Sequence, residues 1–202
     1  MISMHFTQLA LLAFGAVFVN NIVVFRFLGL CSAFSEARKP GNSAMVGITV
    51  AAIMTLATLF AWPINAFFLV PLHLDHMQVL IFIIIVAALV ELSELVMLSI
   101  SPALHVRLGM HLPSLIANCA LLGGVLLSTG SGGKTGDIPG FIESLVTAAS
   151  MGAGFVLIMV LIEGIQERLD LINVPAPFRG LPILLACAGF IALAFLGLTG
   201  IG

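Results

Sequence analysis

The chain contains no tyrosine, a single tryptophan and very few charged residues. Of its 202 residues, 7 are lysine or arginine and 9 are aspartate or glutamate, so only 8% are charged. Soluble domains carry about 25% charged residues, and this shortage excludes a water-facing globule. It also excludes a nucleic-acid-binding surface, which needs clustered basic residues. With so few tyrosine and tryptophan side chains, the aromatic belt that marks membrane interfaces is thin.

Cysteine is scarce as well, with three residues, Cys31, Cys119 and Cys187. Three cysteines in apolar surroundings are too few for a disulfide framework. An odd number inside a membrane protein leaves two interpretations open. The thiols either pack as small apolar groups or bind a metal together with ligands from another chain.

Apolar residues dominate instead, at 61% of the sequence with a mean hydropathy of +1.25. A hydrocarbon core about 30 Å thick needs roughly 20 apolar residues per helix. We therefore predict an all-α integral membrane protein whose residues 1–202 form a single membrane domain. The N-terminus has no basic residue before its apolar run and no small-residue cleavage pattern, so we expect a retained span rather than a signal peptide. Six stretches qualify as spans, at about 6–30, 44–70, 78–100, 110–128, 141–166 and 180–200.

Basic residues in the connections between these spans predict the orientation. The first, third and fifth connections hold Arg38, Lys39, Arg107, Arg168 and Arg179, the second holds none, and the fourth holds Lys134 alone. Positively charged connections stay on the cytoplasmic side. We therefore expect a multi-pass protein of the bacterial inner membrane with both termini on the outer, periplasmic side.

Six spans divide into two halves of three, residues 1–100 and 103–202. Because three is odd, the second half must enter the membrane from the opposite side, as in an inverted-topology repeat. Each half begins with a glycine-containing span that carries a cysteine, Cys31 or Cys119. Such repeats place discontinuous helices and their site near the bilayer midplane. We therefore predict two inverted three-helix repeats with broken helices in spans 1 and 4.

Small and helix-breaking residues surround these two cysteines. Cys187, in contrast, lies in an ordinary apolar run and is interpreted as a packing thiol. A helix interrupted near a cysteine frees backbone N–H groups that stabilise negative charge, which thiolates bound to iron require in an apolar medium. Because an iron–sulfur cluster takes four cysteine ligands, a cluster bound by Cys31 and Cys119 would need two more cysteines from a second membrane subunit. The neighbours are Gly29 and Ser32 for Cys31, and Pro113, Asn118, Gly123 and Gly124 for Cys119.

Four charged residues within or near the spans have competing interpretations. Glu91 and Glu94 are three residues apart and share one helical face, where they form either an ion pathway or an interfacial or partner contact. Arg26 either reaches the headgroups along the membrane surface or holds positive potential near the cluster. Glu163 is interpreted as a residue near the cytoplasmic end of its helix, with a functional role as the alternative.

Polar and small residues elsewhere suggest packing roles. Asn20 and Asn21 either satisfy the backbone of a broken helix or bind the sister subunit. Gly152 and Gly154 are predicted to form a small-residue packing face between helices.

Four motifs together resemble the RnfA family, membrane proteins of the Rnf electron-transport complex, and the related NqrE family of the sodium-translocating NADH:quinone reductase is the second match. The resemblance extends from about residue 8 to 200. The sequence VPAPFRG at 174–180 favours the Rnf member. The motifs are NNIVVFRFLGLCSAF (20–34), LGMHLPSLIANCALLGG (108–124), GAGFVLIMVLIEGIQERL (152–169) and VPAPFRGLPILLACAGFIALAFLGLTG (174–200).

This resemblance implies a six-helix protein that pairs with a homologous sister, RnfE. The pair shares one 2Fe-2S cluster at the membrane midplane, with Cys31 and Cys119 as the ligands from this chain. Electrons pass from cytoplasmic iron–sulfur and flavin subunits through the cluster to an external flavin-bearing subunit. The whole complex exchanges electrons between ferredoxin and NAD and couples this flow to sodium or proton transport. The chain itself is then a non-autonomous relay component without its own substrate pocket.

Two other functional classes are compatible with the same span pattern. A small solute or ion permease also uses inverted repeats and broken helices, and a purely structural protein can anchor a larger complex. Both classes predict a colourless protein without iron.

Overall fold

A computed structural model of the chain describes residues 11–19, 21–30, 43–69, 71, 77–100, 118–131, 138–170 and 180–199. No strand occurs among these residues, and the prediction of an all-α protein is confirmed for them. The elements are the π-helix η1 (Gly15–Val19), α2 (Ile22–Arg26), α4 (Ser43–Ile64), the π-helix η2 (Asn65–Leu69), α5 (Gln78–Ile100), α8 (Cys119–Ser131), α9 (Ile138–Asp170) and α10 (Leu181–Thr199).

Among the described residues, three helical segments are long and apolar enough to cross a membrane. They are α4 continued by η2, over 43–69, then 78–96 in α5 and 140–169 in α9. The helices α8 and α10 are apolar but shorter. The membrane class predicted from composition is thereby supported. Six spans, two inverted repeats and broken helices in spans 1 and 4 stay predictions, because 31–42, 101–117, 132–137 and 171–179 lie outside the described residues.

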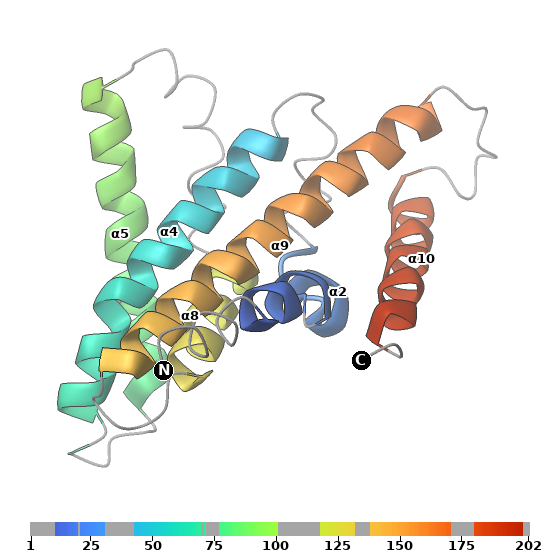
Figure 1. Cartoon of the computed structure of the whole chain (residues 1–202). Coiled ribbons are helices and arrows are strands. Elements are labelled where there is room, and N and C mark those ends of the chain that lie inside the picture. Colours follow the sequence, from blue (N-terminus) through green and yellow to red (C-terminus); the bar gives the residue numbers. More distant parts are fainter. Residues whose placement is uncertain are drawn as a thin grey trace.

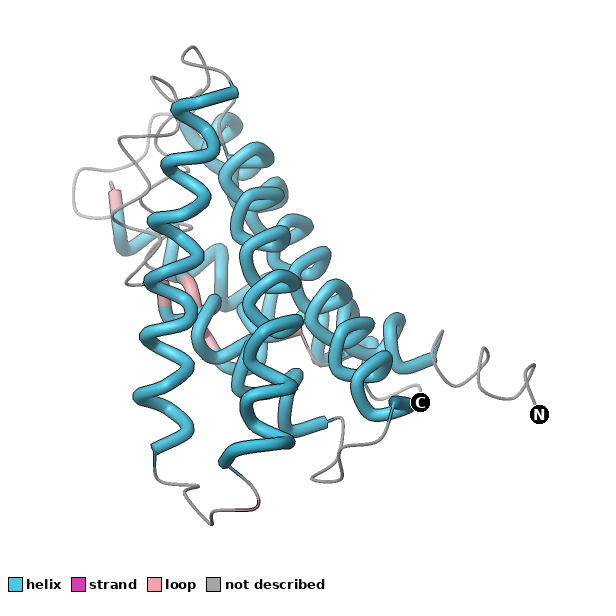
Figure 2. The backbone as a smooth tube through the Cα atoms, turned by 90° about the vertical axis from the view of Figure 1, so that its left-hand side faces the viewer, coloured by secondary structure: helices cyan, strands magenta, loops and turns pink. Residues whose placement is uncertain are grey.

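The helices α4, α8 and α9 form the centre of the bundle (Figure 1). On one flank α5 packs against α4 and α8, and on the other α10 packs against η1, α2 and α9. Figure 2 shows from the side that the described backbone is almost entirely helical. Within the apolar windows, 56% of α9 is buried and only 17% of α5. Therefore α9 is the central helix, and most of α5 is left to face lipid or another protein.

The central helices α4 and α9 run antiparallel and approach closely through small residues. Ala51 of α4 lies against Gly152 of α9, and further along the pair Trp62 contacts Phe141 with their ring centroids 5.2 Å apart. The same contact explains the predicted packing role of Gly152. Small residues at such crossings let helix backbones approach in a membrane.

In contrast, α8 runs parallel to α4. The Met54 side chain of α4 fills the space left by Gly124 of α8, and one turn later the hydroxyls of Thr58 and Ser128 are 3.0 Å apart. The second and fourth predicted spans thus share a direction, while the second and fifth are opposed. These are the relative directions that spans crossing the membrane alternately must have.

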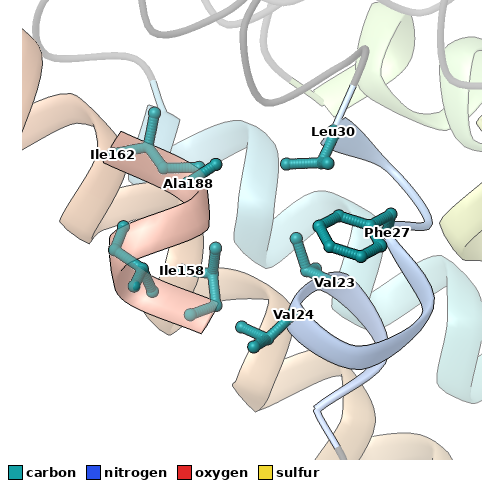
Figure 3. Close-up of a pocket in the computed structure, with 8 residues that line it drawn as sticks. Val23, Val24, Phe27, Leu30, Ile158, Ile162 and Ala188 are labelled. Atoms are coloured by element: carbon teal, nitrogen blue, oxygen red, sulfur yellow. The ribbon is translucent and has the colours of Figure 1, made fainter. Parts of the chain in front are cut away.

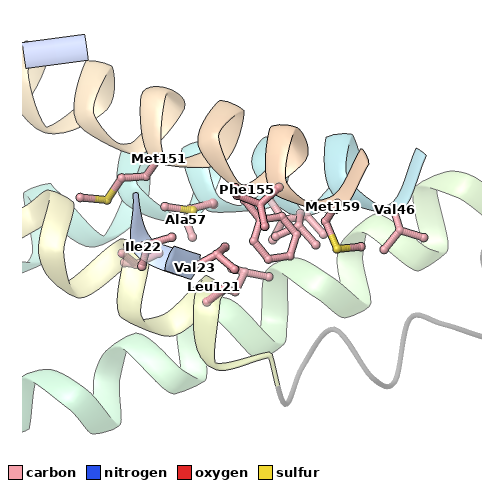
Figure 4. Close-up of a cluster of buried hydrophobic side chains, with 14 of the residues drawn as sticks. Ile22, Val23, Val46, Ala57, Leu121, Met151, Phe155 and Met159 are labelled. Atoms are coloured by element: carbon pink, nitrogen blue, oxygen red, sulfur yellow. The ribbon is translucent and has the colours of Figure 1, made fainter. Parts of the chain in front are cut away.

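A continuous apolar core joins the short helix α2 to the long ones (Figure 4). Ile22 and Val23 of α2 are each 1% exposed and meet Leu121 and Phe155 in this cluster. An isolated helix of one or two turns is unstable in water because nucleation is unfavourable. The position of α2 therefore depends on this burial rather than on its own helical propensity.

The contact between α4 and α9 gives a matched pair of stability predictions. A methyl group at Gly152 would lie 2.8 Å from Ala51 Cβ and 2.9 Å from Ala51 Cα, whereas one at Gly164 on the same helix meets nothing within 4 Å. Alanine is favoured over glycine in a helix by about 1 kcal/mol. We expect Gly164→Ala to raise the thermal unfolding temperature in detergent. Gly152→Ala should lower it, because overpacking costs about 1–3 kcal/mol.

Both variants are compared by thermal unfolding of the purified protein. An equal rise for Gly152→Ala and Gly164→Ala would contradict the close packing of α4 on α9, since it would show that the contact accepts a methyl group without cost.

Candidate metal-ligand site at the start of α8

Of the two cysteines predicted to bind iron, the structure describes one. Cys119 is the first residue of α8, and its side chain is exposed on the surface of the isolated chain. Cys31 lies outside the described residues. Cys187, predicted to be a packing thiol, lies in α10 and is half-buried.

The helix α8 begins at Cys119 because Asn118 caps it. The Oδ1 atom of Asn118 accepts the N–H of Ala120 at 3.0 Å, and its backbone carbonyl accepts the N–H groups of Leu121 and Leu122 at 3.1 and 3.4 Å. The first peptides of a helix carry partial positive charge. The Cys119 sulfur therefore sits where a negative charge is stabilised.

A second stabilising group reaches this sulfur from the other half of the chain. The backbone N–H of Gly29 donates to Sγ of Cys119 at 3.1 Å. Phe27 and Gly29 both have left-handed backbone conformations, with φ of 53° and 85°, and together they turn the chain after α2. A Cβ atom at Gly29 would lie 2.7 Å from Ala120 Cβ and 2.8 Å from Phe155 Cε2. A residue without a side chain is thus needed for this N–H to reach the sulfur.

The start of α2 is fixed at the middle of α9 by Asn21. Its Nδ2 donates to the carbonyls of Val17 and Gly154 at 3.0 and 3.1 Å, while its Oδ1 accepts the N–H of Val23 at 3.0 Å. Asn21 is fully buried. Of its two predicted roles, the structure shows that Asn21 satisfies backbone groups between η1 and α2. Asn20 lies outside the described residues.

Gly154 explains how Asn21 comes so close to α9. A Cβ atom there would lie 2.8 Å from the Asn21 Nδ2. Gly154 therefore has a packing role, as predicted. It also lies midway between Ile138 and Asp170, the ends of α9. The turn that carries Gly29 contacts the neighbouring Phe155, so the Cys119 site is level with the middle of the central helix.

The amide of Asn118 differs from that of Asn21 in one respect. Asn118 is 5% exposed, and its Nδ2 has no hydrogen-bond acceptor among the described residues. An unsatisfied buried donor costs about 1–3 kcal/mol, and most buried polar atoms in native proteins are paired. An acceptor from outside this part of the chain is therefore expected at this position.

The charged residues considered above lie on three different helices. Glu91 is exposed and Glu94 half-buried on α5, Arg26 is exposed as the last residue of α2, and Glu163 is half-buried in α9. The alternatives for Glu91, Glu94 and Arg26 stay predictions. Glu94 is less exposed than Glu91, but burial alone assigns neither residue to an ion pathway or to a partner contact.

The residues at α8 fit a sulfur-bound metal group in part. An exposed thiol, a helix N-terminus, a backbone N–H on the sulfur and an unpaired amide meet here. Within the described residues, however, no three His, Cys, Asp or Glu side chains gather to hold a metal ion. A metal at Cys119 therefore requires ligands from beyond this part of the chain.

Two pockets in the described part of the structure are lined mainly by apolar side chains. Figure 3 shows the first, between α2, α9 and α10, where Val23, Phe27 and Leu30 face Ile158 and Ile162. Among the described residues that line these two pockets, none carries a charge. The second pocket lies between η1, α8 and α9 and is lined by Leu12, Gly15, Ala16, Val19, Leu126, Leu127, Gly130, Thr147 and Met151.

Comparison with known families identifies the protein family of the chain. A model of the family described as "Rnf-Nqr subunit, membrane protein" matches residues 9–202. The chain belongs to the Rnf-Nqr family. The resemblance predicted from the four motifs is thereby confirmed.

Individual relatives agree with the Rnf-Nqr assignment. A protein of Serratia proteamaculans (strain 568) is 44% identical over 195 residues, which cover 96% of this chain and 98% of the relative. A protein of Yersinia enterocolitica is 42% identical over the same shares of the two chains. Both relatives are named as the A component of an ion-translocating oxidoreductase complex. Within the Rnf-Nqr family, these relatives favour the Rnf member over the quinone-reductase member.

Proposed function

We propose that this Rnf-Nqr chain is the RnfA component of an ion-translocating oxidoreductase complex, where Cys119 and Cys31 bind one half of a 2Fe-2S cluster. The observation that carries the proposal is the position of the Cys119 sulfur, exposed at the start of α8 and bonded by the Gly29 N–H at 3.1 Å. When bound, the cluster supplies one-electron transfer. This chain holds the cluster sulfurs, orients them and stabilises their negative charge.

The depth of the site supports a relay role. Its turn meets α9 at Phe155, next to the midpoint of that helix. With a rise of about 1.5 Å per residue, α9 spans the roughly 30 Å hydrocarbon core with residues to spare. A cluster held by thiolates at this level would divide the apolar layer into two shorter steps, each more favourable for electron transfer than a single crossing.

Two features support a cluster shared with a second protein of the complex. The Cys119 thiol is exposed on the isolated chain, and four cysteines are needed where this chain would supply two. Cys31 follows Gly29 by two residues in the sequence. Because the Gly29 N–H bonds the Cys119 sulfur, we propose Cys31 as the second ligand from this chain. A homologous sister with the same inverted plan, RnfE, supplies the remaining pair.

The family resemblance supports the wider assembly that we propose, and the distribution of basic residues supports its orientation. Electrons enter from cytoplasmic iron–sulfur and flavin subunits and leave to an external flavin-bearing subunit, with ferredoxin and NAD as the terminal partners. Sodium or proton transport is coupled to this flow. The chain lies in the bacterial inner membrane as two inverted three-helix repeats, with both termini outside. The relative directions of α4, α8 and α9 support this topology.

The experiment that tests the proposal is co-expression with the sister RnfE followed by anaerobic purification. We expect about two iron atoms per heterodimer, visible absorption and a paramagnetic signal after reduction with dithionite, as a shared 2Fe-2S cluster requires. A colourless, iron-free heterodimer that is monodisperse and folded would contradict the proposal. It would favour the permease or the purely structural protein.

Glu94 on α5 is the better candidate for a coupled-ion pathway, because it is less exposed than Glu91. We expect Glu94→Gln to reduce the number of ions transported per electron in the reconstituted complex, with electron transfer largely retained. Glu91→Gln on the same helix is the matched control. An unchanged number of ions per electron in Glu94→Gln would exclude Glu94 from the ion pathway and favour the partner contact.

A further inference from the structure

Asn118 has more hydrogen-bonding capacity than its capping role uses. Its Oδ1 accepts the Ala120 N–H at 3.0 Å, which fixes the side chain against the start of α8. Its Nδ2, with two N–H donors, is buried and has no acceptor in the described part of the chain. A cap needs only the oxygen, and serine, threonine or aspartate provide it equally well. Capping therefore does not explain why this residue carries an amide.

Asn21 shows what a structural asparagine cap looks like in the same protein. There Oδ1 caps α2, and Nδ2 donates to two carbonyls, of Val17 and Gly154. Every polar atom of that side chain has a partner within the chain. The comparison identifies the unpaired Nδ2 of Asn118 as the exception, and it belongs to the residue that directly precedes Cys119.

The position of Asn118 limits the chemical nature of the acceptor that its Nδ2 lacks. Its Oδ1 lies 3.4 Å from the point where a Cβ would stand on Gly29, so the amide group sits beside the turn whose N–H bonds the Cys119 sulfur. The Asn118 amide group and the Gly29 N–H thus lie in the same part of the structure as this sulfur. Negatively charged sulfur in an iron–sulfur cluster accepts several N–H donors at once, and the Cys119 sulfur beside this amide already accepts one.

We propose that the Asn118 side-chain amide donates a hydrogen bond to a sulfur atom of the shared 2Fe-2S cluster. Together with the Gly29 N–H, this bond raises the reduction potential of the cluster. This inference rests on the proposed function. Reduction adds one electron to the bound group, with dithionite as the donor in the experiment, and no covalent bond forms or breaks. N–H donors favour the reduced form because they stabilise the added negative charge on sulfur. Asn118 is a positioning and tuning residue rather than a ligand.

The test uses Asn118→Ser in the purified heterodimer, since serine keeps a capping oxygen and lacks the amide. We expect unchanged iron content and signal intensity, and a reduction equilibrium about tenfold less favourable, which is ~59 mV for a one-electron couple. Asn118→Asp keeps the shape and the cap but replaces the donors with a charged acceptor, so its potential should fall further. Cys187→Ser, on α10, should leave the potential unchanged.

A measurement on the unaltered protein covers the case in which the variants fail to assemble. Pulsed paramagnetic resonance of the reduced complex, with asparagine labelled by 15N in its side chain, should detect a nitrogen coupled to the cluster. No coupling, or an unchanged potential in both Asn118 variants, would overturn this inference while leaving the cluster proposal intact. A wild-type heterodimer without iron would instead overturn the proposed function itself.

Discussion

Replacement of Cys119 by serine is expected to remove the paramagnetic signal of the reduced complex and to slow electron transfer by at least about 100-fold. The sulfur of Cys119 is exposed at the start of α8 and accepts the Gly29 N–H, as a ligand shared with a partner requires. Changes beyond the ligand sphere already cost about 10–100-fold in affinity or activity, and removal of a ligand costs more. The measurements are iron content, the low-temperature signal and turnover of the assembled complex.

Cys187→Ser is the matched control for this prediction. That thiol lies half-buried in α10, and its loss should change neither iron content nor turnover. The same experiment on Cys31 extends the prediction to a residue outside the described part of the chain. If Cys119→Ser retained full iron and an unaltered signal, the assignment of this sulfur as a ligand would be wrong.

Replacement of Asn21 by alanine is expected to give the largest loss of stability. The change removes one helix cap and leaves the carbonyls of Val17 and Gly154 without their donor in a fully buried position. Loss of the cap costs about 1 kcal/mol and each buried acceptor about as much again, so we expect about 3 kcal/mol in total. For a chain of this size that is roughly 6–12 °C in unfolding temperature.

Asn21→Ser separates the two contributions in the same thermal unfolding experiment. Serine restores the cap but does not reach both carbonyls, so its unfolding temperature should fall between those of the wild type and Asn21→Ala. Equal stability of the alanine variant and the wild type would show that the connection between α2 and α9 contributes nothing.

The long helices were predictable from hydropathy, and the short ones were not. The predicted spans 78–100 and 180–200 agree with α5 and α10 within a residue or so, because uninterrupted apolar runs define them. The predicted span 141–166 became the longer α9, since charged residues beyond position 166 continue a helix outside the apolar layer. The bounds of η1 and α2 have a different cause. They depend on Asn21 finding a carbonyl 133 residues away.

In the candidate site, too, some features were predictable from neighbouring residues and others depend on contacts between distant parts of the chain. Small neighbours and matching motifs were enough to single out Cys119, and Asn118 was noted as one of those neighbours. The hydrogen bond from Gly29 to the sulfur joins residues 90 positions apart, and no local pattern contains it. The unpaired amide of Asn118 becomes visible only once burial is known. Sequence reasoning therefore singled out the thiol but not the N–H groups near it.

The bond from Asn21 to Gly154 also sets an order of events during biosynthesis. A ribosome elongating at about 5–20 residues per second needs roughly 7–27 s to make the 133 residues that separate them. Until α9, the fifth predicted span, leaves the translocon, the Asn21 amide cannot form its hydrogen bond to the Gly154 carbonyl. The contact of Asn21 with α9 therefore forms late in synthesis. Under the proposed function, iron delivery to this chain then follows insertion of its C-terminal half.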